Sequence, residues 1–206
     1  SFYFLKPRQA NVENITAAHS TFYLEQLHEH LEKKDPFSYD RDTYLMKDSL
    51  TTAQLAAGGC LEMADSIMSA EFDHGFALIR PPGHHAEPGR GMGFCILNNI
   101  GITARYLLKT YKLQRILILD FDAHHGNGTQ EIFYESDNVL VVSLHQSGLF
   151  PFSGAMEELG SGDGAGSDNQ VGAGEGGKDE EGADSGPGAG VGAGDGVGPA
   201  MQEGST

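Results

Sequence analysis

Residues 115–128 join an apolar run to a dense group of polar side chains. Arg115–Leu119 is short, apolar and rich in β-branched residues, which predicts a buried parallel strand. Asp120, Asp122 and His124 follow it at alternate positions. Since side chains alternate along an extended chain, we expect these three to lie on one side of it. Two carboxylates and an imidazole suit Zn²⁺ or a similar divalent cation, with one position left for water. The spacing therefore predicts a metal site, and an acidic turn with surface histidines is the alternative.

A second polar group follows another apolar run, Gly75–Ile79, which predicts a further strand. Two prolines force the chain to leave this strand in extended form, and His84 and His85 come next. Buried imidazoles need hydrogen-bond partners, and we expect these in groups such as Asp120 and Asn127. A carboxylate behind one ring would raise its basicity, whereas an amide behind the other would leave it less basic. Such a difference separates an acid from a base within one site. A purely structural histidine pair is the alternative.

Four motifs, in this order, resemble the zinc-dependent histone deacetylase superfamily, which includes acetylpolyamine amidohydrolases and acetoin-utilisation proteins. The motifs are Arg80-Pro-Pro-Gly-His-His-Ala, Gly93-Phe-Cys-Ile-Leu-Asn-Asn, Asp120-Phe-Asp-Ala-His-His-Gly-Asn-Gly-Thr-Gln and Val142-Ser-Leu-His. Asn127 and the Thr-Gln pair after it are more similar to the class II deacetylases and their bacterial relatives. The resemblance covers about residues 10–160. It implies an α/β fold of the arginase and deacetylase type, with a central parallel sheet flanked by helices.

The resemblance also implies catalytic roles and metal ligands. His84, paired with Asp120, and His85, paired with Asn127, would carry out the proton transfers. The zinc ion would be held by Asp122, by His124 and by a further aspartate from a later strand. A potassium ion beneath the zinc would be enclosed by backbone carbonyls and by three residues in particular, namely Asp120, Ser143 and Leu144.

Substrate-binding residues are implied in the same way. Gly93 and Phe94 end a polar loop, and Phe94 matches one wall of a narrow tunnel for the methylene groups of acyl-lysine, with Phe150 as the opposite wall. A plain core phenylalanine is the alternative reading of Phe94. At the rim of the pocket, an aspartate would accept backbone N–H groups of the substrate. Asp40 matches this aspartate, Asp42 is the close competitor, and a solvated loop carboxylate is the alternative.

Periodic apolar residues predict the elements that position these groups. Helices are expected at residues 14–34, 51–70 and 98–112, with a further helix from residue 129 and a strand at 139–144. Residues 37–50 are expected to form a polar loop. The histidines of the first helix are predicted to be surface or supporting residues and not ligands, namely His19, His28 and His30.

Composition excludes several classes of protein. A chain of 206 residues is long enough for one domain with a core. A formal charge of −16 argues against general nucleic-acid binding. No apolar run is long enough for a membrane span and no signal peptide is evident, although a start at Ser1 suggests a cut end. Cys60 and Cys95 are predicted to be reduced core residues of an intracellular protein, either cytoplasmic or nuclear.

The composition changes near Gly160, which predicts two regions. Residues 1–160 are expected to form a partial histone deacetylase-like domain, and residues 161–206 a low-complexity acidic tail rich in glycine. The strand that the family has after Ser167 is expected to be absent here, and the tail to be disordered. Half of the parallel sheet would then be missing. A foreign, frameshifted or spliced end is predicted, with a functional acidic linker as the alternative.

These departures bear on activity. The family needs a tyrosine that hydrogen-bonds the substrate carbonyl, and the last tyrosine of this chain is Tyr134. The resemblance thus implies a zinc-dependent deacetylase of chromatin-related or polyamine substrates, acting on acetylated lysine or acetylpolyamine, of which this chain is an inactive form. The competing hypotheses are a non-catalytic fragment or interaction module and an arginase-type dimanganese hydrolase. The latter is disfavoured by the small number of carboxylates.

Overall fold

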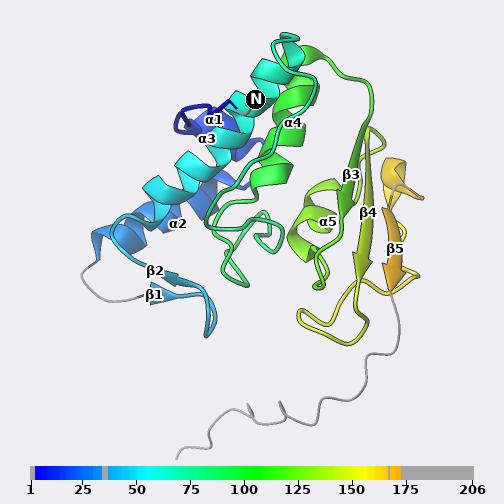
Figure 1. Cartoon of the computed structure of the whole chain (residues 1–206). Helices are drawn as coiled ribbons and strands as arrows, with labels where there is room; N and C mark the ends of the chain where they lie inside the picture. Colours follow the sequence, from blue (N-terminus) through cyan, green and yellow to red (C-terminus); the bar gives the residue numbers. More distant parts are fainter. Residues whose placement is uncertain (1–2, 34–36, 167, 173–206) are drawn as a thin grey trace, which may run out of the picture. The chain divides into compact units, whose positions relative to one another are not determined.

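The computed structural model describes residues 3–33, 37–166 and 168–172 (Figure 1). Its α-helices are α1 (Val12–Thr16), α2 (Thr21–Glu32), α3 (Ser49–Met68), α4 (Asn99–Tyr111) and α5 (Asn127–Phe133). Its strands are β1 (Phe37–Ser38), β2 (Tyr44–Leu45), β3 (Ile116–Asp120), β4 (Val139–His145) and β5 (Asp168–Gly172), and a 3₁₀ turn spans Gly162–Gly164. Helices and parallel strands thus form the α/β architecture expected from the sequence.

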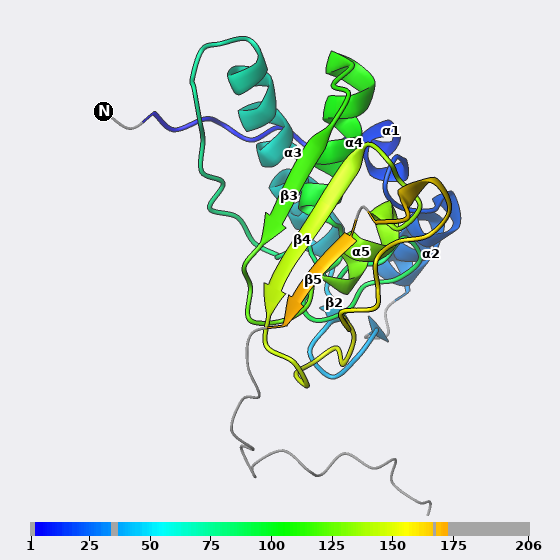
Figure 2. The same ribbon diagram turned by 90° about the vertical axis from the view of Figure 1, so that its right-hand side faces the viewer.

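The main sheet has the strand order β3-β4-β5, and all neighbouring strands are parallel (Figure 2). Asp120 at the end of β3 is the register partner of Ser143 in β4. The carboxyl ends of parallel strands meet at one edge of a sheet, where ligands of α/β proteins usually bind. The residues predicted to do chemistry therefore collect at this edge.

One face of this sheet is packed and the other is open. Ile118, Val139 and Val141 point into the core shared with α4 and α5, which lie beside this face in Figure 1. Leu117 and Leu119, on the other face of β3, are 62% and 54% exposed. The predicted strand is confirmed, but the prediction that all of it is buried is wrong. Among the described residues, helices cover only one face of the sheet.

The apolar run at residues 75–79 is not a strand. Phe76 and Leu78 in this run are 88% and 90% exposed. A strand forms only where a neighbouring strand completes its hydrogen-bond ladder, and no strand in the described ranges pairs with this run. The strand predicted here is therefore wrong.

The sheet continues beyond the predicted end of the domain. Residues 168–172 form β5, which pairs in parallel with β4 from Val141 to His145. The prediction that no strand follows residue 167 is wrong, because backbone groups complete a ladder whatever side chains they carry. The rest of the predicted tail, residues 173–206, lies outside the described residues.

Two helices replace the single one predicted at residues 14–34. The chain turns at residues 17–20, where Ser20 caps α2 by accepting the backbone N–H of Tyr23. The backbone N–H of Ser20 donates to the carbonyl of Pro88, so this turn also holds the loop after the histidine pair. The helices predicted at 51–70 and 98–112 are confirmed within two residues at each end. The helix predicted from residue 129 is also present and begins at Asn127.

His19 lies in this turn, and its ring is hydrogen-bonded to the backbone of the segment that follows the histidine pair. Its side chain is 3% exposed. Nδ1 lies 2.9 Å from the carbonyl oxygen of Glu87, and Nε2 lies 2.9 Å from the backbone nitrogen of Asn98, the N-cap of α4. A carbonyl only accepts and an N–H only donates, so the neutral ring with its proton on Nδ1 satisfies both. Of the two roles predicted for this histidine, surface or supporting, the structure shows the supporting one.

Cys60 and Cys95 are both free and buried, as predicted, and burial raises the pKa of the two thiols to about 11 and about 12. Within the described ranges, no helix is long and apolar enough to cross a membrane.

His19 should make stability depend on pH. Burial lowers the pKa of His19 from 6.5 to about 4, and its backbone hydrogen bonds offset this only in part. The unfolded chain therefore binds more protons than the folded one between these two values, so stability falls as the pH drops through this window. The cost is about 1.4 kcal/mol per pH unit and about 3 kcal/mol in total.

The variant His19→Gln can make both hydrogen bonds but cannot titrate. Urea unfolding at pH 7, 5.5 and 4.5 should show a steeper loss of stability for the wild-type chain than for His19→Gln. Parallel curves for the two proteins would contradict this role of His19.

Candidate active site

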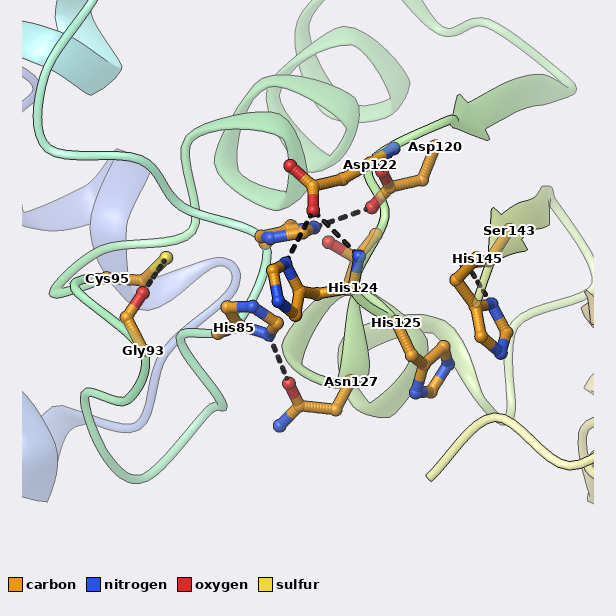
Figure 3. Close-up of polar contacts among 12 residues, drawn as sticks. His85, Gly93, Cys95, Asp120, Asp122, His124, His125, Asn127, Ser143 and His145 are labelled. Atoms are coloured by element: carbon orange, nitrogen blue, oxygen red, sulfur yellow. Dashed lines mark hydrogen bonds and ion pairs between the residues drawn. The ribbon is translucent and has the colours of Figure 1, made fainter. Parts of the chain in front are cut away.

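The two adjacent histidines have different partners. His84 Nδ1 lies 2.8 Å from Asp120 Oδ2, and His85 Nδ1 lies 2.8 Å from Asn127 Oδ1 (Figure 3). The two rings are 4.0 Å apart. Asp120 ends β3 and Asn127 begins α5, so both partners come from the segment that leaves the sheet. The pairings expected from the sequence are formed.

Two glycines allow α5 to approach the histidine pair. A Cβ atom on Gly126 would lie 2.4 Å from Asp120 Oδ2, and one on Gly128 would lie 2.2 Å from the carbonyl oxygen of Ala86. Real Cβ atoms do not come so close to other heavy atoms. The sequence His-Gly-Asn-Gly therefore places Asn127 beside His85 because its flanking residues have no side chains.

His85 is held in its neutral form. Burial is the largest cause that lowers the pKa of His85 to about 4, and the nearby His84 lowers it further, while the bond with Asn127 acts in the opposite direction. A ring that is neutral near pH 7 has one bare nitrogen that can accept a proton.

Asp122 and His124 are the predicted zinc ligands. Asp122 Oδ1 lies 3.1 Å from His124 Nδ1, close to the separation of about 3.4 Å between two ligands on a tetrahedral zinc ion. Burial alone would raise the pKa of Asp122, but hydrogen bonds from His124 and the charge of His84 lower it overall. An ionised carboxylate and an imidazole nitrogen fit two ligand positions of zinc. In the part of the chain that is described, no three His, Cys, Asp or Glu side chains are arranged to hold a metal ion.

The predicted potassium ligands lie on adjacent strands. Asp120 and Ser143 are register partners, and Leu144 follows Ser143. Ser143 Oγ also lies 2.8 Å from Nδ1 of the buried His145, so this hydroxyl is oriented by a neighbour. The potassium site stays a prediction.

Phe150 lies against His85, one of the two adjacent histidines. Its ring centroid is 5.1 Å from that of His85, and the rings meet edge to face. Phe94 is exposed and has a positive φ of 67°. It lines an open pocket of ≈ 550 Å³ together with Thr43 and Arg80. Phe94 is therefore not a core residue, and its role as the second wall stays a prediction.

Asp40 binds the protein's own backbone. Its Oδ1 accepts the N–H groups of Asp42 and Thr43 at 2.9 and 2.6 Å, and its Oδ2 accepts that of Gly93 at 2.9 Å. Burial alone would raise the pKa of Asp40, but these hydrogen bonds lower it overall. The carboxylate thus fixes the Gly93 turn. Asp42 is exposed and lines the pocket beside Phe94. The contact of Asp40 with substrate, with Asp42 as the competitor, stays a prediction.

Sequence reasoning did not single out two residues that support the site. Glu87 Oε1 accepts a hydrogen bond from Asn127 Nδ2 at 2.8 Å. Thr43 is buried, and its Oγ1 accepts the backbone N–H of Phe94 at 2.7 Å. For Glu87, a signal was available, because an acidic side chain two residues after His85 can reach the same side of an extended chain. No local pattern indicated the role of Thr43.

Known proteins are similar to this chain over most of its length. The histone deacetylase domain family matches residues 1–184. A protein named "Probable deacetylase" from Archaeoglobus fulgidus is 46% identical over 162 residues, which are 79% of this chain and 44% of that protein. Human histone deacetylase 9 is 48% identical over 117 residues, which are 55% of this chain and 12% of that protein. The crystal structure of the HDA15 HD domain matches with a TM-score of 0.77 and 35% identity, over 81% of this chain and 49% of that one.

These similarities define a class first, an α/β domain with the histone deacetylase fold. Within that class, the chain belongs to the histone deacetylase family. It spans about half the length of the archaeal relative and of the solved domain. The arginase and deacetylase fold predicted from the sequence is confirmed.

The contacts of Asp40 and Asp42 predict different effects of substitution. Asp40→Ala leaves three backbone N–H groups without their acceptor, so urea unfolding should show a loss of about 1–3 kcal/mol. Asp42→Ala removes an exposed carboxylate and should change stability by less than about 0.5 kcal/mol. Equal losses for the two variants would contradict the structural role of Asp40.

Proposed function

We propose that this site serves the zinc-dependent hydrolysis of an acetyl amide on a lysine side chain or a polyamine. One observation carries the proposal. Two adjacent histidines, one backed by a carboxylate and one by an amide, lie beside an Asp-His pair with the spacing of metal ligands. Zinc, when bound, supplies polarisation of the amide carbonyl and activation of water.

The partners of the two histidines support separate roles. His85 is neutral, donates from Nδ1 to Asn127 and keeps Nε2 as a proton acceptor, which suits a general base. His84 pairs with a carboxylate, which stabilises positive charge on an imidazole beside developing negative charge. Phe150 beside His85 helps to keep water away from the ring.

The proposed substrates are acetylated lysine peptides and acetylpolyamines inside the cell, in cytoplasm or nucleus. The pocket beside Phe94 would receive the part of the substrate outside the tunnel, with Asp42 at its rim. Chromatin is one setting in which acetyl-lysine occurs. Potassium, enclosed by Asp120, Ser143 and Leu144, would stabilise the end of β3.

We further propose that the 206-residue polypeptide by itself is not an efficient catalyst. The described site supplies two zinc donors, and the last tyrosine in the sequence is Tyr134, at the end of α5. A non-catalytic interaction module is the second candidate, favoured by the exposed apolar face of β3. A dimanganese hydrolase is disfavoured because Asp120, one of the two carboxylates at the end of β3, is engaged by His84.

The proposed activity can be tested by completing the domain. Residues 173–206 are replaced by the part of the Archaeoglobus fulgidus relative that follows its aligned region. The 206-residue chain should show little or no hydrolysis of an acetyl-lysine peptide, whereas the chimera should turn over and be inhibited by a hydroxamate. In the chimera, His85→Ala should lower kcat/KM by about 10²–10⁴ because a general base is lost.

His28→Ala, at an exposed position of α2, is the matched control and should leave the rate unchanged. An active chimera that is indifferent to both His84→Ala and His85→Ala would refute the proposed roles.

Zinc binding can be measured without activity. With two donors, the 206-residue chain should bind zinc reversibly and lose it on dialysis against a mild chelator, as metal analysis will show. His124→Ala should abolish what binding remains, while His28→Ala should not alter it. Stoichiometric zinc that survives dialysis would contradict the expectation of a weak site.

A further inference from the structure

The amide of Asn127 lies between two side chains with opposite requirements. Its Oδ1 is 2.8 Å from Nδ1 of His85, and its Nδ2 is 2.8 Å from Oε1 of Glu87. An amide can present either its oxygen or its NH₂ group in a given direction, so its neighbours decide which way it faces.

Glu87 decides the orientation because an ionised carboxylate only accepts hydrogen bonds. Asn127 must present its NH₂ group to Glu87, and its oxygen then faces His85. That oxygen needs a donor, so the proton of the neutral His85 ring sits on Nδ1 and Nε2 keeps its lone pair. Among the described residues, the NH₂ group of Asn127 has one other contact, with the sulfur of Met92 at 3.5 Å, which is a weak acceptor.

The carboxylate of Glu87 is held in place on several sides. Its backbone N–H donates to the carbonyl of Arg90 at 3.0 Å, and its own carbonyl accepts from His19 Nδ1 at 2.9 Å. Its second carboxylate oxygen lies 3.4 Å from Arg90 Nε. Glu87 therefore meets Asn127 from a fixed backbone position, which is what a positioning residue requires.

We propose that Glu87 is a positioning residue that sets the tautomer of His85 through the amide of Asn127. The inference deepens the proposed function, since a base needs its lone pair on the nitrogen that faces the substrate. The catalytic purpose of the tautomer rests on the proposed function, but the proposed role of Glu87 in setting it does not. The tautomer itself is a property of the folded chain and can be measured whether or not the chain is catalytic.

A purely structural role for Glu87 makes a different prediction. If Glu87 served only to pair with Arg90 and fasten the loop, its removal would lower stability but leave the proton of His85 on Nδ1. The tautomer of His85 therefore separates the two roles, whereas a melting temperature does not.

The test uses the full 206-residue chain labelled with ¹⁵N-histidine. Long-range ¹H–¹⁵N correlation spectra at pH 7 distinguish a protonated ring nitrogen from a bare one, and the His85→Gln spectrum assigns the signals. The wild-type chain should show His85 protonated on Nδ1. In Glu87→Ala the amide of Asn127 loses its constraint, so the spectrum should change to a mixture in which Nε2 is also protonated.

Two variants complete the design. Glu87→Gln keeps an oxygen that can accept from Asn127 and should restore the wild-type signature. Glu131→Gln alters a neighbouring glutamate of the same pocket that is not bonded to Asn127, and should leave the signature unchanged. Should Glu87→Ala not fold, Glu87→Met keeps the length of the side chain and removes both oxygens.

The outcome is decisive in either direction. A mixed tautomer in Glu87→Ala or Glu87→Met, with the wild-type form in Glu87→Gln, supports the proposal. An Nδ1-protonated His85 in a folded Glu87→Ala or Glu87→Met chain overturns it. Neither result depends on turnover, so failure of this inference is distinguishable from failure of the proposed deacetylase activity.

Discussion

The hydrogen bonds from two adjacent imidazoles to the segment that leaves β3 are the interactions on which the site depends. They join His84 and His85, on an irregular loop, to Asp120 and Asn127 across a separation of 36 and 42 residues. Such bonds form only if the loop and the start of α5 come into close contact, which the side-chain-free positions around Asn127 permit. His85 is buried and His84 is partly buried, so each ring would cost free energy without its partner, and the pairing also fastens the loop to the sheet.

The same loop is held from the other side by groups that do no chemistry. His19 satisfies the backbone on both sides of the segment from Glu87 to Asn98, and it can do so only as a neutral ring. Asp40 and Thr43 hold the turn at Gly93 and Phe94, where both residues have a positive φ. Histidine and aspartate thus serve here as scaffold, with pKa shifts caused by burial and hydrogen bonds. A shifted pKa alone does not separate such residues from catalytic ones.

Helices pack against one face of the main sheet and leave the other face exposed in the described part of the chain. Leu117 and Leu119 are exposed on the face of β3 opposite α4 and α5, and Leu140 and Leu144 extend this apolar surface onto β4. Parallel sheets generally have helices on both faces, because their side chains are apolar on both. The apolar run of β3 therefore predicted a parallel sheet correctly. Among the described residues, however, helices pack on only one face of that sheet.

The sequence by itself determined the family, the helices with strong apolar periodicity, the strand that ends at the candidate site and the identity of the histidine pair with its partners. These follow from short patterns in which neighbouring residues share one strand or turn, so their meaning is local. Tertiary structure decided what no local pattern carries. Residues 75–79 have no partner strand, and β5 forms from residues with no strand-like composition. His19 is buried, and the carboxylate of Asp40 binds backbone N–H groups. The fold also brings Glu87 to Asn127. Backbone ladders and long-range hydrogen bonds depend on which segments meet, and that is a property of the whole fold.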